Sequence, residues 1–295
     1  MPERDGYMPG VPCWIDTSQP DPEAAVDFYS ALFGWEFENV MPPGAGMYFL
    51  GRLRGREVAA VSAIPESAPA RASWDTYVSV ESADETTSKV RDAGGGVDKE
   101  PFDVPGAGRM AVLTDREGAA FCVWEAKQFK GARVVNEPGS LNFNGLNTRD
   151  VESAKSFYGS VFGWETMGLS GGFAAWTLPG YGDYLERDDP ELRKRVAEVG
   201  GPAGFEDVVA SINPIADDQP DVPAHWSVTF GVADADATAE TAAQLGGTVV
   251  LPPVDVPWSR MTILTDPQGA TFIASQFVLE NKDLGSHPDA AVGAA

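Results

Sequence analysis

Two side chains in the first half of the chain are of types that support catalysis. Asp75 stands in the strand-like segment WDTYVSVES, and Cys122 stands in AAFCVWEA. A carboxyl group among aromatic side chains keeps its proton to a higher pH than usual, so Asp75 could act as a general base or anchor a ligand ammonium. An aspartate at the solvated end of a strand is the alternative. We favour an inert buried thiol for Cys122, because a nucleophilic thiol needs a nearby base and the first half has no histidine.

The histidine content excludes several classes of metal site. The chain has two histidines, His225 in PAHWSVTF and His287 in the small-residue segment LGSHPDAAVGAA. A zinc site with three histidine ligands is therefore impossible, and an iron site with two histidines and a carboxylate would need both of them in one place. For His225 we favour a histidine at a strand entrance that binds backbone or water.

Composition and charge narrow the class of partner. The chain has 295 residues, and 44 acidic against 21 basic side chains give a formal net charge of −23. A field of this sign repels nucleic-acid backbones and anionic lipids, and it favours cationic ligands during encounter. The sequence has no apolar run long enough for a transmembrane helix, no secretory leader pattern and only two cysteines. We therefore expect a cytoplasmic protein that binds a small molecule and neither nucleic acid nor membrane.

The chain contains a duplicated domain. FYSALFGWEFE (28–38) returns as FYGSVFGWETM (157–167), and RMAVLTDREGAAF (109–121) returns as RMTILTDPQGATF (260–272). The offset grows from 129 to 151 residues, so the second copy carries an insertion of about 22 residues. We expect domains at 10–127 and 140–280, a linker at 128–139 and a flexible tail at 281–295. Arg109 and Arg260 recur at equivalent positions, which suggests a structural role such as binding loop carbonyl groups.

The order of elements within each copy predicts an α+β fold. Each copy reads as two units, and each unit has one strand, one helix and further strands. The helix PDPEAAVDFYSALFG, for example, has Pro22 in its first turn and an apolar face at helical spacing. The insertion at 181–201 predicts a charged helix near 186–199, either a solvated surface helix or a lid or interface arm.

These motifs resemble the vicinal oxygen chelate superfamily, which includes glyoxalases, bleomycin-resistance proteins, fosfomycin-modifying enzymes and extradiol dioxygenases. The resemblance rests on the D…FY…LFGW helix and the T-D-x-x-G-A-x-F ending of both copies. It covers about 10–280 in tandem and is nearest to the two-domain hydroxylase type. It implies tandem glyoxalase-like domains, each with two βαβββ units whose curved sheet forms an open cup around a ligand.

The resemblance also implies positions for metal ligands, on the first strand of each unit and on the closing strand. This chain places other residue types there. The positions hold Trp14 and Phe143 on the first strands, Asp75 and Ser227 on the next units' first strands, and Cys122 and Ile273 on the closing strands. These side chains do not make a familiar ligand set, so we expect neither a metal nor another cofactor.

Aromatic residues dominate what remains in the expected cups. Side chains alternate along a strand, so an inward Trp14 implies an inward Asp16, and an inward Cys122 implies an inward Trp124. Such aromatic residues could stack on a flat ligand or simply fill a core. The expected substrate-binding residues are Trp14, Asp16, Tyr77, Cys122, Trp124, Phe143, Asn147 and Ser227.

Two classes of function follow from these features. The first is a metal-independent enzyme of the lyase, isomerase or hydroxylase-like kind that acts on an aromatic or polycyclic small molecule, as in natural-product tailoring, with Asp75 as its catalytic residue. The second is a non-catalytic protein that sequesters an antibiotic. A metal-dependent glyoxalase or dioxygenase is disfavoured by the ligand positions. Tandem copies allow either a monomer or a homodimer.

Overall fold

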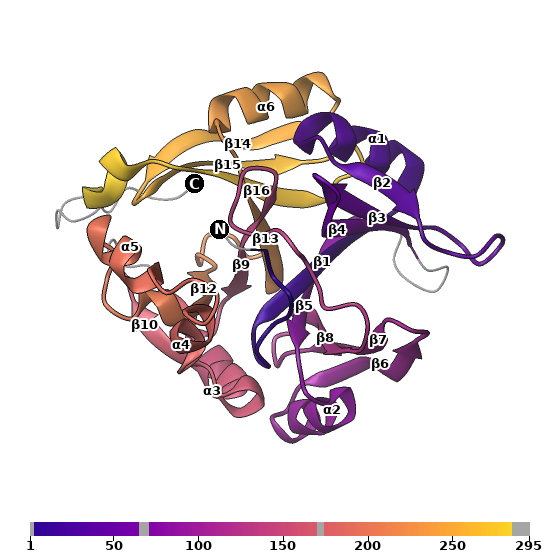
Figure 1. Ribbon diagram of the computed structural model, residues 1–295, viewed down its shortest axis with the longest axis horizontal. Helices are drawn as coiled ribbons and strands as arrows, with labels where there is room; N and C mark the ends of the chain where they lie inside the picture. Colours follow the sequence, from indigo (N-terminus) through magenta and orange to yellow (C-terminus); the bar gives the residue numbers. More distant parts are fainter. Residues whose placement is uncertain (1–2, 65–70, 170–173, 285–295) are drawn as a thin grey trace.

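The computed structural model describes residues 3–64, 71–169 and 174–284 and contains two eight-stranded mixed sheets (Figure 1). The first, in the order β2-β3-β4-β1-β5-β8-β7-β6, consists of β1 (Pro12–Gln19), β2 (Glu36–Asn39), β3 (Tyr48–Leu53), β4 (Arg56–Ala63), β5 (Ser73–Ser79), β6 (Gly96–Val104), β7 (Gly108–Thr114) and β8 (Ala120–Ala126). The second, in the order β10-β11-β12-β9-β13-β16-β15-β14, consists of β9 (Ser140–Thr148), β10 (Glu165–Gly168), β11 (Ala174–Thr177), β12 (Val208–Pro214), β13 (His225–Gly231), β14 (Thr248–Val256), β15 (Ser259–Thr265) and β16 (Thr271–Phe277). The predicted α+β class and the tandem duplication are confirmed.

Each unit carries one main helix after its first strand. These helices are α1 (Pro22–Phe33), α2 (Ala83–Asp92), α3 (Val151–Phe162) and α6 (Ala235–Gln244). The Asp21 carboxylate caps α1 by accepting a hydrogen bond from the Ala24 amide at 3.1 Å, and Gly34 ends the helix with a left-handed φ of 71°. The equivalent helix α3 begins and ends in the same way, at Asp150 and Gly163. The duplication therefore extends to the helix caps.

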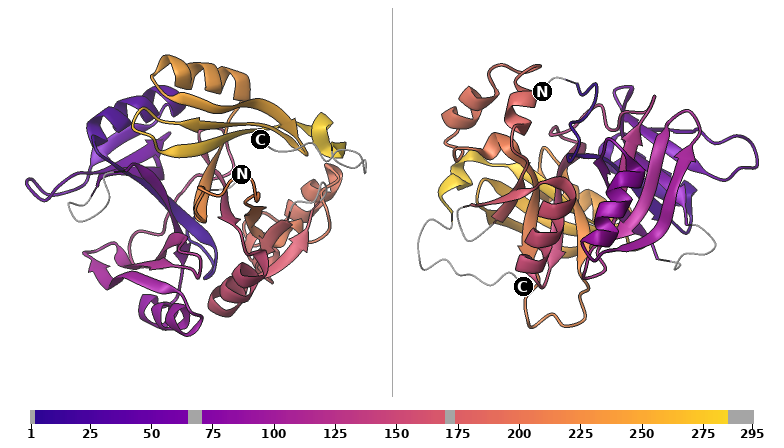
Figure 2. Two further views of the ribbon diagram at one scale, coloured as in Figure 1. Left: turned by 180° about the vertical axis from the view of Figure 1, so that it is seen from behind. Right: turned by 90° about the horizontal axis from the view of Figure 1, so that it is seen from below.

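The two sheets share a hydrophobic core that consists of two clusters, each with residues from both copies. Phe28 and Tyr29 of α1 pack against Phe272 of β16, in the other copy. In the same way, Tyr158 of α3 packs against Phe121 of β8. As a result α1 lies beside α6 and α2 lies beside α3, on opposite sides of the molecule (Figures 1 and 2). Each copy's first helix thus covers the outer face of both sheets, and the inner faces point away from this shared core.

Most of the tryptophans belong to this shared core. Trp35 closes α1 and donates a hydrogen bond to the Gly139 carbonyl at 2.7 Å, and Trp164 does the same to the Gly10 carbonyl at 2.8 Å. The core also contains Trp74, Trp176 and Trp226. Only Trp14 and Trp124 pack in the separate cluster on the inner face of the first sheet.

The insertion in the second copy forms two short helices instead of one. They are α4 (Tyr181–Leu185) and α5 (Leu192–Glu198), followed by the 3-10 turn η2 (Phe205–Asp207) before β12. Pro190 lies between the two helices, where it removes a backbone donor that one continuous helix would need. Arg193 holds the insertion together, because its guanidinium binds Asp183 at 2.7 Å and Glu206 at 2.8 Å.

At the carboxyl end, the 3-10 turn η3 (Leu279–Asp283) follows β16. The expected flexible tail at 281–295 lies outside the described residues from 285 onward. None of the helices in the described ranges is both long and apolar enough to cross a membrane.

Candidate functional site

The inner face of the first sheet brings together the residues predicted for the first copy. Asp16 of β1 is the register partner of Asp75 of β5, and Tyr77 of β5 is the partner of Cys122 of β8. Their neighbours in sequence, such as Ile15 and Trp74, point the other way into the shared core. The face thus carries Trp14, Asp16, Asp75, Tyr77, Cys122 and Trp124.

Asp16 is a buried carboxylate held by two tyrosines. Its side chain is 4% exposed, and its Oδ2 accepts hydrogen bonds from the hydroxyl groups of Tyr48 and Tyr77, both at 2.9 Å. The Trp14 indole donates in turn to the Tyr48 hydroxyl at 3.1 Å. Asp75 lies directly opposite and is half-buried, and among the described residues no side chain forms a hydrogen bond or ion pair with it.

This arrangement gives the two carboxyl groups different pKa values. Burial, reinforced by the charge of Asp16, raises the pKa of Asp75 to about 8. Burial also raises the pKa of Asp16, but the two tyrosine hydrogen bonds lower it again in part, because they favour the charged form. At neutral pH the proton therefore resides on Asp75 and the charge on Asp16. One acid and one carboxylate lie side by side.

The aromatic residues beside this pair form a filled cluster. Trp14, Tyr77 and Trp124 are only 3%, 7% and 6% exposed. Phe129 packs edge-on against Trp14, with ring centroids 4.8 Å apart, and its carbonyl accepts a hydrogen bond from the Trp124 indole at 2.9 Å. A ligand can stack on these rings only if Phe129 moves. Asp75 and Tyr48, which remain half-exposed, are the accessible part of the face.

Cys122 lies within this cluster as a buried thiol. Burial and the charges of Asp75 and Asp16 raise its pKa well above the ordinary value. A thiol in this environment stays protonated and is a poor nucleophile.

The inner face of the second sheet carries a different set of side chains. Asn147 donates to the Ser227 hydroxyl at 3.0 Å, and Ser227 donates to the Gly145 carbonyl at 3.2 Å. On β12, Asn213 donates to Ser211 at 3.3 Å. Phe143 lies on the same face, opposite Thr229 of β13. The predicted residues Phe143, Asn147 and Ser227 are thus brought together, in uncharged surroundings.

Sequence reasoning missed Tyr48, Ser211 and Asn213. Tyr48 stands in the strand-like segment GMYFLGRL, where alternation alone gives two equal choices of face. Its contact with Asp16 depends on how β3 pairs with β4 and how β4 pairs with β1. The positions of Ser211 and Asn213 on this face depend similarly on the pairing of β12 with β9, and β12 is the strand that comes after the insertion.

The residues present do not fit the metal that the resemblance implies. Across residues 3–64, 71–169 and 174–284, no group of three or more His, Cys, Asp or Glu side chains could hold a metal ion. Glu125, three residues beyond Cys122, accepts a hydrogen bond from the Ala83 amide at 3.0 Å and so caps α2. His225 is exposed, and its Nδ1 lies 2.8 Å from the Pro223 carbonyl oxygen. His287 lies outside the described residues.

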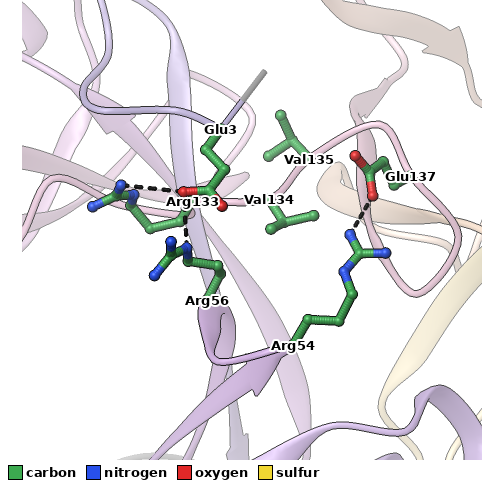
Figure 3. Close-up of a pocket in the computed structure, with 7 residues that line it drawn as sticks. All are labelled: Glu3, Arg54, Arg56, Arg133, Val134, Val135 and Glu137. Atoms are coloured by element: carbon green, nitrogen blue, oxygen red, sulfur yellow. Dashed lines mark hydrogen bonds and ion pairs between the residues drawn. The ribbon is translucent and has the colours of Figure 1, made fainter. Parts of the chain in front are cut away.

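A cavity of about 170 Å³ lies at the protein surface, beside the turn between β3 and β4 and the segment 133–137 (Figure 3). It is lined by Glu3, Arg54, Arg56, Arg133, Val134, Val135 and Glu137. Each of its three arginines already has a carboxylate partner, because Glu3 binds Arg56 at 2.8 Å and Arg133 at 3.5 Å, and Arg54 binds Glu137. Exposed ion pairs of this kind contribute little to stability.

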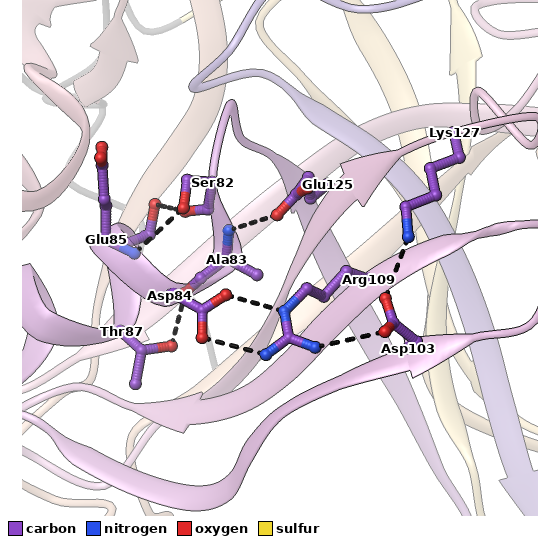
Figure 4. Close-up of polar contacts among 10 residues, drawn as sticks. Ser82, Ala83, Asp84, Glu85, Thr87, Asp103, Arg109, Glu125 and Lys127 are labelled. Atoms are coloured by element: carbon purple, nitrogen blue, oxygen red, sulfur yellow. Dashed lines mark hydrogen bonds and ion pairs between the residues drawn. The ribbon is translucent and has the colours of Figure 1, made fainter.

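Arg109 and Arg260 have equivalent structural roles (Figure 4 shows Arg109). The Arg109 guanidinium binds both oxygens of Asp84, at 2.7 and 3.0 Å, in the first turn of α2. Arg260 binds Asp236 of α6 in the same way, at 2.6 and 2.8 Å. The partners are carboxylates and not the loop carbonyl groups that the sequence suggested. Each arginine ties a strand to the start of a helix.

Comparison with known proteins agrees with this architecture. Residues 14–123 and 140–273 match the family model described as the glyoxalase/bleomycin resistance protein/dioxygenase superfamily. The chain is 38% identical over 278 residues to CFP32 of Mycobacterium tuberculosis, which carries the provisional name glyoxylase, with 92% of this chain and 97% of CFP32 covered. It is 35% identical over 302 residues to the anthracycline biosynthesis protein DauV of Streptomyces sp. strain C5, with 98% and 99% covered.

The fold is also similar to that of solved structures. The Mn(II)-bound glyoxalase from Novosphingobium aromaticivorans matches with a TM-score of 0.58 at 15% identity, with 91% of this chain and 82% of that chain covered. The 2,3-dioxygenase LapB from Pseudomonas sp. KL28 matches with a TM-score of 0.58 at 11% identity, with 92% and 93% covered.

Proposed function

Because the chain belongs to the glyoxalase/bleomycin resistance protein/dioxygenase superfamily, we propose that it is a metal-independent enzyme that transfers a proton on an aromatic or polycyclic small molecule. The observation that carries the proposal is the pair formed by Asp16 and Asp75. Opposed carboxyl groups with separated pKa values are a common arrangement for acid and base catalysis. The donor set at the family's metal positions gives no support to metal-dependent glyoxalase or dioxygenase chemistry.

The substrate class is supported by two relatives. DauV and the DnrV protein of Streptomyces peucetius, both 35% identical to this chain, are named for anthracycline biosynthesis. Anthracyclines are polycyclic aromatic compounds, so a role in natural-product tailoring agrees with these names. Trp14, Tyr77 and Trp124 lie beside the carboxyl pair, and a flat ligand would stack on them once Phe129 moves aside.

The chemistry that the pair supports is an isomerisation. The protonated Asp75 donates its proton to a carbonyl oxygen of the substrate, and the resulting carboxylate removes a proton from the adjacent carbon. The ketone becomes an enol, Asp75 is regenerated, and no oxidant or reductant is consumed. Asp16 acts as a positioning residue, because its negative charge keeps the proton on Asp75 until the substrate oxygen accepts it.

Deuterium exchange tests this proposal. Metal-free protein in D2O is incubated with polycyclic aromatic ketones, such as 2-tetralone and tetracyclic hydroxyketones, and exchange beside the carbonyl is followed by NMR. We expect Asp75→Asn to slow the exchange by about 10²- to 10⁴-fold while ligand binding is retained. Asp92→Asn, at the exposed end of α2, is the control for the loss of one charge.

Two outcomes contradict the proposal. Exchange that is equally fast in Asp75→Asn places the chemistry elsewhere, and exchange that requires an added metal ion contradicts metal independence. Tight binding without any exchange supports the alternative function, a protein that sequesters its ligand.

A further inference from the structure

Three arginine side chains converge on the surface cavity of Figure 3. Arg54 and Arg56 come from the turn between β3 and β4 and from the start of β4, and Arg133 comes from the segment that joins the two copies. The lining also includes two carboxylates, those of Glu3 and Glu137, so its guanidinium groups exceed its carboxylates by one. The cavity is therefore lined by a local excess of positive charge, in a chain whose net charge is −23.

One of these arginines has a donor that no described residue accepts. The Nε–H group of Arg133 is buried and has no hydrogen-bond partner among residues 3–64, 71–169 and 174–284. Its Nη2, by contrast, lies 2.8 Å from Asp5 and 3.5 Å from Glu3. A buried donor without an acceptor is unfavourable. An oxyanion bound along this edge of the guanidinium would supply the missing acceptor.

The turn that carries Arg54 has an unusual backbone for its residue type. Arg54 and Gly55 connect β3 to β4, and both have left-handed φ angles, of 53° and 74°. Asparagine, aspartate or glycine is preferred at the first position of such a hairpin turn, because a longer side chain is strained there. An arginine that is kept at a strained position beside a cavity points to a role for its side chain.

Glu3 shows that this site holds an anion. The Glu3 carboxylate binds Arg56 at 2.8 Å and Arg133 at 3.5 Å, and the hydrogen bond from Arg56 lowers the pKa of Glu3. Its side chain is nevertheless 44% exposed, and ion pairs with this exposure contribute little free energy. A ligand with two negative charges and more oxygen atoms can therefore replace Glu3 at small cost.

We propose that this cavity binds a small oxyanion of the phosphate class, with two negative charges, and that Glu3 is the internal carboxylate that the ligand displaces. Planar guanidinium groups bind pairs of phosphate oxygens. One water molecule occupies roughly 30 Å³ in the liquid, so a cavity of about 170 Å³ has room for an ion of phosphate size. Val134 and Val135 lie between the two ion-paired groups and complete the lining (Figure 3).

The acidic character of the chain does not oppose this site. Charges in solution are screened over about 8 Å at physiological ionic strength, so distant carboxylates weigh less than guanidinium groups in contact with the ligand. The cavity has no residue in common with the carboxyl pair of Asp16 and Asp75. The anion site is thus a binding function beyond the proposed proton transfer.

Isothermal titration calorimetry of the full chain with inorganic phosphate, at constant ionic strength, tests the proposal. We expect Glu3→Gln to tighten binding about three- to tenfold, because it removes the competing carboxylate. Arg56→Gln/Arg133→Gln should weaken binding by about tenfold or more. Arg91→Gln and Glu152→Gln each break an exposed ion pair, on α2 and α3, and should leave phosphate binding unchanged as matched controls.

Further titrations identify the ligand and decide the outcome. Sulfate should compete with phosphate, whereas chloride at the same ionic strength should not. Tighter binding of glycerol 3-phosphate identifies a phosphorylated small molecule as the ligand, equal or weaker binding identifies the free ion, and both support the site.

The absence of phosphate binding in Glu3→Gln overturns the proposal. Equal binding in the double arginine variant, shown by circular dichroism to be folded, also overturns it. Asp75→Asn should bind phosphate as the wild type does, so a failure to observe deuterium exchange would leave this result unaffected.

Discussion

Asp16 and Asp75 face each other across the antiparallel pair β1–β5, and only Asp16 receives hydrogen bonds from the tyrosines beside it. Two carboxyl groups so close repel each other when both are charged. The tyrosine hydroxyl groups stabilise the negative charge of Asp16, and Asp75 keeps its proton. The equivalent pair in the other sheet, Gly145 and Ser227, contains nothing that titrates. At this pair of positions, therefore, the first sheet has a titratable acid and the second sheet has none.

The first prediction concerns the pH dependence of stability. The pKa of Asp75 is 3.8 in the unfolded chain and about 8 in the folded protein. A raised folded-state pKa stabilises the protein fully below the unfolded value, and this contribution is lost as the pH rises through the folded value. We expect the free energy of unfolding to fall between pH 5 and 8.5, and Asp75→Asn to flatten that slope. Urea denaturation across this pH range measures the slope. An equal slope in the variant would contradict the assignment of the raised pKa to Asp75.

The second prediction concerns the tyrosines that bind Asp16. Tyr48→Phe removes a hydrogen bond that favours the carboxylate, so the pKa of Asp16 should rise. The Trp14 indole also loses its acceptor, and we expect a loss of about 1–2 kcal/mol in the free energy of unfolding. Carbon-13 NMR titration of the aspartate carboxyl groups follows the pKa. Tyr7→Phe, which loses a bond to the Ala132 carbonyl instead, should leave the Asp16 titration unchanged.

Much of the first inner face could be predicted because strand alternation is a local property. Once Trp14 is placed inward, Asp16 follows from the spacing of two. The repeated segments likewise predict the duplication, because they are similar in sequence and occur in the same order in both halves of the chain. The structure adds to this the pairing of Asp16 with Asp75, which depends on the register between β1 and β5 and turns two separate aspartates into one pair.

The contacts between distant segments could not be read from the sequence. Tyr29 and Asp266 form a buried hydrogen bond although they are 237 residues apart. Tyr48 reaches Asp16 only through the pairing of three strands. A helix that packs under the sheet of the other copy has the same apolar periodicity as one that packs under its own, so the pattern in α1 predicts a buried face but not the partner that buries it.

The third prediction concerns the arginine clamps at the helix starts. The hydrogen bonds from Arg109, together with its charge, lower the pKa of Asp84, and Arg260 acts in the same way on Asp236. Both pairs are exposed to solvent, so we expect Arg109→Lys to lower the free energy of unfolding only slightly and this loss to shrink in high salt. Urea denaturation at low and high ionic strength measures the effect. A large, salt-independent loss would show that the clamp contributes through packing.

The fourth prediction compares the two polar contacts that join the domains. Tyr158 donates to Asp115 at 3.0 Å and accepts from the Trp226 indole at 2.9 Å, and all three side chains are buried. Tyr158→Phe leaves the indole without an acceptor and the carboxylate oxygen without its donor, so we expect a loss of about 1–3 kcal/mol in the free energy of unfolding.

The symmetric contact should be less sensitive. Tyr29 donates to the Asp266 Oδ2 at 2.9 Å, but Gln19 donates to the same oxygen at 2.7 Å. After Tyr29→Phe the carboxylate keeps one donor on that oxygen, and only the Trp74 indole loses its acceptor. The loss should therefore be smaller than for Tyr158→Phe, and Gln19→Leu combined with Tyr29→Phe should give a loss equal to that of Tyr158→Phe. Urea denaturation of the three variants orders them, and a greater loss for Tyr29→Phe alone would show that Gln19 does not support the carboxylate.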